Sequence, residues 1–127
     1  GPGSNALRLS DAACDSARRA CVAEGGDFAI EWLLGPPVRA LESFALELRV
    51  VRGSVPMDAQ ITVDFHMRAM DMGQTRYRLQ RAADGVWHGR AMLPVCVSGR
   101  SDWVAAVSIQ ADGRRWTAEL PFTVTRR

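Results

Sequence analysis

Alternation of apolar and polar residues with a period of two dominates the chain after residue 27. Such alternation is typical of β-strands that bury one face. Turn signals separate the alternating runs: Gly35-Pro36-Pro37 halts the first, and Asp84-Gly85 and Asp112-Gly113 are typical of tight hairpins. The pattern therefore predicts seven strands, near residues 28–34, 44–50, 61–66, 76–80, 87–93, 103–109 and 116–124.

Short strands joined by tight turns, with little helix, predict an all-β fold. We expect a single antiparallel β-sandwich of immunoglobulin- or cupredoxin-like type, because 127 residues suit one domain. The expected divisions are an expression-tag remnant over residues 1–4, an N-terminal arm over 5–27 and the sandwich over 28–127. The tag-like start leaves room for a native signal peptide or membrane anchor ahead of the domain.

Composition excludes few classes of protein. Hydrophobic residues make up 47% of the chain and charged residues 24%, which is ordinary for a globular domain. The formal net charge of +2 is too small to argue for nucleic acid or an anionic membrane, and the arginines form no basic run. We therefore expect no nucleic-acid partner.

Sulfur-bearing residues are the strongest sign of chemistry. Met67, Met70 and Met72 follow His66 closely, and Cys96 stands later in the chain. Thioether, imidazole and thiolate together suit Cu(I). If the strands run up and down, the methionine loop and the cysteine loop reach the same rim of the sandwich. We expect a Cu(I) site there, with Met70 and Met72 as the first ligands, Cys96 third, and His66 or Met67 next.

The alternative is a non-metal protein-interaction module. Methionines also form adaptable apolar surfaces, so Met67, Met70 and Met72 could dock a partner protein without any metal. Replacing Met70 and Met72 by leucine should abolish copper binding but spare docking. Catalysis is not expected, because the two histidines, His66 and His88, lie in no recognisable catalytic motif.

Cys14 and Cys21 leave two structures open. In a continuous helix over residues 11–21 they would lie about 10 Å apart along the axis, beyond the Cα limit of about 7 Å for a disulfide. The segment is therefore either helical with two thiols, or non-helical and bridged. An oxidising compartment favours the bridge, and we expect a structural disulfide that leaves Cys96 free.

Three motifs between about residues 44 and 124 resemble the FixH/YtkA-like periplasmic domains. They are Met70-Asp71-Met72-Gly73, Arg76-Tyr77-x-Leu79 and Leu93-Pro94-Val95-Cys96-x-x-Gly99-x-x-x-Trp103. The cysteine pair followed by Pro36-Pro37 is similar to the subgroup with the Leu-Pro-x-Cys motif. The resemblance implies an immunoglobulin-type sandwich in the bacterial periplasm or cell envelope. It also implies a metallochaperone that holds or delivers copper during cytochrome oxidase assembly, with a copper-donating or copper-receiving envelope protein as its partner.

Overall fold

The computed structural model of the chain describes residues 4–67, 76–94 and 103–125. These residues form nine β-strands and no helix. No helix in this part of the chain is therefore long and apolar enough to cross a membrane. The strands are β1 (Ser4–Leu9), β2 (Cys21–Gly25), β3 (Phe28–Leu34), β4 (Phe44–Arg52), β5 (Gln60–Met67), β6 (Arg76–Arg81), β7 (Trp87–Ala91), β8 (Trp103–Ala111) and β9 (Arg114–Phe122).

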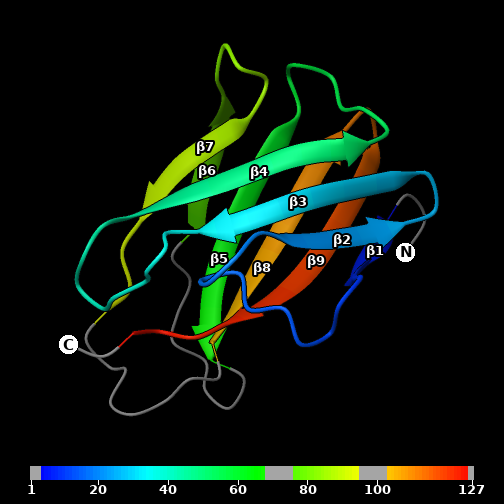
Figure 1. The fold of residues 1–127 in the computed structure, drawn as a ribbon. Helices are drawn as coiled ribbons and strands as arrows, with labels where there is room; N and C mark the ends of the chain where they lie inside the picture. The colour runs from blue at the N-terminus through cyan, green and yellow to red at the C-terminus, as the bar shows by residue number, and fades with distance from the viewer. Residues whose placement is uncertain (1–3, 68–75, 95–102, 126–127) are drawn as a thin grey trace.

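The strands close into a barrel in the order β1-β2-β3-β4-β7-β6-β5-β8-β9. Every neighbouring pair is antiparallel except β1 and β9, which run parallel from Ser4 opposite Arg115 to Leu7 opposite Ala118. Figure 1 shows β3 and β4 crossing over β5, β8 and β9, so the barrel has two broad walls. The described residues thus form a mixed barrel.

The predicted seven-strand sandwich, and with it the immunoglobulin- and cupredoxin-like description, is wrong. Residues 5–27 were expected to form an arm, but they contribute β1 and β2 to the barrel. Ser4, expected to belong to a tag remnant, pairs with Arg115. Strand β1 hydrogen-bonds to β2 on one side and to β9 on the other. This closure removes the free sheet edges that an open sandwich would leave.

Inward-facing residues of both walls fill the barrel. Trp87, Trp103 and Trp116 are all buried. Phe65 lies among aromatic rings, with the centroids of Phe44 and Phe122 each 5.7 Å from its own. Burying a large apolar side chain of this kind stabilises the fold by about 1.5–3 kcal/mol. The apolar residues of the period-two pattern are therefore the ones that face the core.

A disulfide closes the turn between β1 and β2. Cys14 and Cys21 are bridged with their Cα atoms 5.9 Å apart, and the residues between them form turns and bends. Within this turn, Asp15 Oδ1 accepts from the Thr123 amide at 3.2 Å, and Asp15 Oδ2 accepts from the Thr123 hydroxyl at 2.5 Å. The Leu34 amide donates to the Ser16 carbonyl at 2.8 Å. The turn is thus fixed to the ends of β3 and β9.

Candidate binding groove

The first three expected copper ligands, Met70, Met72 and Cys96, lie outside the described residues. The strands that flank them are described and end close together. Met67, the last residue of β5, pairs with Trp103, the first residue of β8. The Tyr77 hydroxyl of β6 donates to the Met92 carbonyl just beyond β7, at 2.9 Å. We call this end of the barrel, where β3, β5, β7 and β9 end, the loop rim.

His66 and Met67 lie on opposite faces of the barrel wall. Met67 is 2% exposed and belongs to the hydrophobic core. His66 is half-buried on the outer face, as strand parity predicts, and pairs in register with Val104. Consecutive strand residues point to opposite sides of a sheet, so these two side chains do not converge on one outer site.

The description of the chain as a copper-binding periplasmic protein of cytochrome oxidase assembly finds no support in the described residues. Among them, no group of three or more histidine, cysteine, aspartate or glutamate side chains is placed to hold a metal ion. Of the expected donors, this part of the chain contains only a core methionine and a half-buried histidine.

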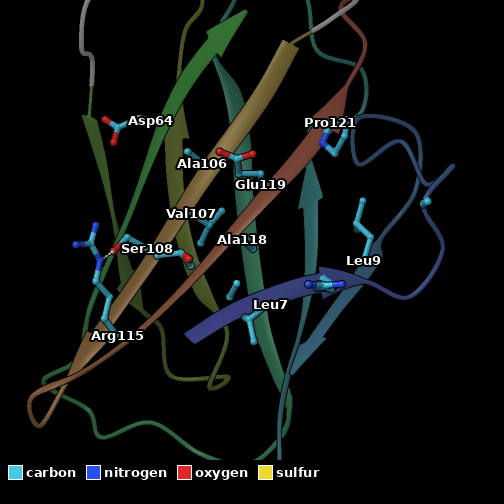
Figure 2. A pocket seen from close by; sticks show the side chains of 14 residues that line it. Leu7, Leu9, Asp64, Ala106, Val107, Ser108, Arg115, Ala118, Glu119 and Pro121 are labelled. Atoms are coloured by element: carbon cyan, nitrogen blue, oxygen red, sulfur yellow. Dashed lines mark hydrogen bonds between the residues drawn. The ribbon is translucent and has the colours of Figure 1, made fainter. Parts of the chain in front are cut away.

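A groove of about 780 Å³ lies on the outside of the wall formed by β5, β8 and β9. Figure 2 shows this groove, with Asp64 and Ser108 on one side and Leu7 and Leu9 of β1 on the other. Small side chains make the groove possible, because bulkier ones on the outer face of β8 and β9 would fill it. The lining residues are Ala6, Leu7, Arg8, Leu9, Ala12, Asp64, Ala106, Val107, Ser108, Arg115, Thr117, Ala118, Glu119 and Pro121.

Strand register places two carboxylates on either side of Ala106. Asp64 of β5 pairs with Ala106 of β8, and Ala106 pairs with Glu119 of β9. Neighbouring strands lie about 4.8 Å apart, so the two acidic residues are separated by about 10 Å across the wall. The next outward-facing row, farther from the loop rim, pairs two hydroxyl residues, Ser108 of β8 and Thr117 of β9.

Some charged side chains of the groove already have a partner within the described part of the chain, and others do not. Arg76 Nη2 lies 3.3 Å from Asp64 Oδ2, and Arg76 Nε also donates to this carboxylate, at 3.3 Å. Arg115 Nε donates to Ser108 Oγ at 3.1 Å. Glu119 is exposed and has no hydrogen-bond or ion-pair partner among the described residues. The carboxylates of Asp64 and Glu119 lie toward Pro121, and Arg115 lies toward the other end of the groove (Figure 2).

The opposite wall carries a different outer surface. There, ion pairs cross from strand to strand, with Arg49 Nε 3.9 Å from Glu31 Oε1 and Arg52 Nη2 3.8 Å from Glu24 Oε2. His88 adds a contact of 4.0 Å with Glu47. These long side chains stand over β2, β3, β4 and β7. The wall of β5, β8 and β9 instead exposes small residues at its centre, and this difference favours it as the binding face.

The groove is not visible in the sequence because its lining residues come from distant strands. The signal that was available is the run of small outward residues in the last two strands, at Ala106, Ser108 and Thr117. That run could not reveal the boundary formed by β1, because β1 itself was not predicted. Comparison with protein families, curated proteins and solved structures finds no match for the chain. The geometry of the groove therefore carries the functional argument alone.

Proposed function

We propose that this chain is a protein-interaction module that binds an extended segment of a partner protein in the groove beside β9. The observation that carries the proposal is the groove itself, a depression of about 780 Å³ bordered by β1 and centred on small residues of β8 and β9. A strand face built this way leaves room for a ligand, whereas bulky side chains would occupy the space.

The mixture of groups in the groove suits a polypeptide. Leu9, Ala12 and Pro121 offer apolar contacts near the loop rim, and Ser108 and Thr117 offer hydroxyls farther along. An extended peptide needs both, because its side chains alternate and its backbone groups must keep hydrogen-bond partners. An open groove also accepts a chain that continues beyond both of its ends. These features support a peptide segment over a small apolar ligand.

A binding role also agrees with the chemistry of the groove. Its two carboxylates are held apart by Ala106, and one of them, Asp64, is engaged by Arg76. Neither histidine of the chain lines the groove. Cu(I) binding by Met70, Met72 and Cys96, and a location in the cell envelope, stay predictions from the sequence.

Selection from a displayed library of random peptides tests the proposal. The selected peptides are measured against the wild type and against Ala106→Gln, which fills the centre of the groove without adding charge. Ala45→Gln is the matched control, because Ala45 is also a half-buried alanine on an outer strand face but lies on β4 of the other wall. We expect Ala106→Gln to weaken binding about tenfold, since it removes contact at the centre of the interface.

Two results would contradict the proposal. One is that no peptide is enriched above the background of an unrelated barrel. The other is that enriched peptides bind Ala106→Gln as tightly as the wild type, or lose affinity for Ala45→Gln instead. Both glutamine variants must first show the wild-type circular dichroism spectrum and melting temperature, so that a loss of binding is not a loss of folding.

A further inference from the structure

We infer that the groove recognises a segment with one acidic and one basic side chain four residues apart, the basic one toward the loop rim. This inference rests on the proposed function and adds the chemistry of the partner. It starts from two residues of β9, Arg115 and Glu119, which both line the groove. They lie four positions apart on one strand and on the same face, so their Cα atoms are about 13 Å apart.

Closure of the barrel decides how a peptide can be recognised. Each of the nine described strands has a hydrogen-bonded neighbour on both sides. A peptide therefore cannot add itself as another strand, which is the common way for a sheet to bind an extended segment. It must lie on the outer face and be held by side chains. Recognition then depends on the charged and hydroxyl groups that the groove presents.

The state of each charge sets the expected pattern. Asp64 is already held by Arg76, so Glu119 is the exposed carboxylate left to meet a basic group. Arg115 uses its Nε for Ser108 Oγ, which leaves the other guanidinium N–H groups to meet an acidic side chain. An extended peptide places residues i and i+4 on one face about 13 Å apart, which matches the spacing of the two protein charges.

Arg8 of β1 is the other cation that lines the groove. It is exposed, and it forms no ion pair within 4.0 Å among the described residues. An acidic peptide side chain could therefore meet Arg8 instead of Arg115. A peptide that used Arg8 would need a different separation between its acidic and basic residues from one that used Arg115. The experiment must therefore distinguish the two arginines.

The experiment titrates the ¹⁵N-labelled protein with four capped threonine-rich heptapeptides. They carry glutamate and lysine, two glutamates, two lysines, or two glutamines at their second and sixth positions. We expect the glutamate–lysine peptide to bind most tightly, because each exposed ion pair contributes about two- to fivefold in affinity. Glu119→Gln and Arg115→Gln should each remove one such factor, and Arg115→Gln should cost more affinity than Arg8→Gln.

A nitroxide beside the peptide lysine gives the orientation. It should broaden the amides of Glu119 and Leu120 more than those of Arg115 and Trp116. Equal binding of the glutamine peptide, tighter binding of either like-charged peptide, the reverse broadening, or a loss of affinity in Arg8→Gln alone would overturn the inference. In those cases a peptide still occupies the groove and the proposed function stands. Failure of all four peptides and of every library-selected peptide to shift groove amides would overturn both.

Discussion

The hydroxyl of Tyr77 bonds to both backbone groups of Met92. It donates to the Met92 carbonyl at 2.9 Å and accepts from the Met92 amide at 3.4 Å. This contact supports a short strand pairing, because β6 and β7 share only the register pairs Gln80–His88 and Arg81–Trp87, as few as β1 and β2 share. Tyr77 also lies 5.8 Å from Phe65, measured between ring centroids. One side chain thus ties the start of β6 to the end of β7 and to the core.

Tyr77→Phe should therefore destabilise the barrel while leaving its core intact. The variant keeps the ring that contacts Phe65 but loses two hydrogen bonds to Met92, and we expect a loss of about 1 kcal/mol in the free energy of unfolding. Urea denaturation measures it, and an unchanged m-value would show that the folded state stays equally compact. An unfolding free energy equal to that of the wild type would mean that water replaces the phenol without cost.

Met67 should behave as a core residue and not as a metal ligand. Met67→Leu conserves volume, so we expect it to cost less than about 1.5 kcal/mol, whereas Met67→Gln buries an amide and should cost about 2–4 kcal/mol. Any Cu(I) affinity of the chain, measured by competition with a chromophoric chelator, should be the same in wild type and Met67→Leu. A drop in Cu(I) affinity in the leucine variant would contradict the inward position of this thioether.

The disulfide should stabilise the barrel by limiting the unfolded chain. Cys14 and Cys21 are seven positions apart, and closure of so short a loop contributes about 2.5 kcal/mol on the chain-entropy estimate. We expect the Cys14→Ser/Cys21→Ser variant to lose this amount in guanidinium denaturation. Comparison within a Cys96→Ser background excludes thiol exchange. A variant as stable as its background would show that the hydrogen bonds to Thr123 and Leu34 fix the turn without the bridge.

The carboxyl of Asp84 should titrate below its ordinary pKa of 3.8. The main cause is the Val86 amide, which donates to Asp84 Oδ1 at 2.9 Å, and the contact with His88 lowers the pKa further. Because the folded-state pKa is depressed, the ionised group stabilises the hairpin above the unfolded-state pKa, and this contribution is lost as the pH falls through the folded-state pKa. Carbon-detected NMR titration measures the midpoint, and a value at or above 3.8 would contradict the hairpin bond.

Seven of the nine strands could be predicted because their apolar alternation is local. The run ending at Phe65, for example, requires only that every second residue faces the core, and the burial of Phe65 beside a half-buried His66 follows from it. Strand β1 could not be predicted in this way. It shows only Leu7 and Leu9 as an alternating pair, and its place is set by parallel pairing with residues more than 100 positions away.

The groove could not be predicted for a related reason. Asp64, Ala106 and Glu119 are unremarkable outward residues in the sequence, and only the register of three strands brings them side by side. The ion pair between Arg76 and Asp64 also depends on strand pairing, so the sequence alone does not show that Asp64 is already neutralised. Outward strand positions carry no hydrophobic signal of their own, so a site on the outer face depends on long-range pairing.

The most direct test of the proposed function is an amide shift map of the ¹⁵N-labelled protein with a library-selected peptide. We predict shifts confined to residues 6–9, 106–108 and 117–120, and their loss in Ala106→Gln but not in Ala45→Gln. Shifts that cluster on β3, β4 and β7, or that persist unchanged in Ala106→Gln, would show that the groove beside β9 is not the binding site.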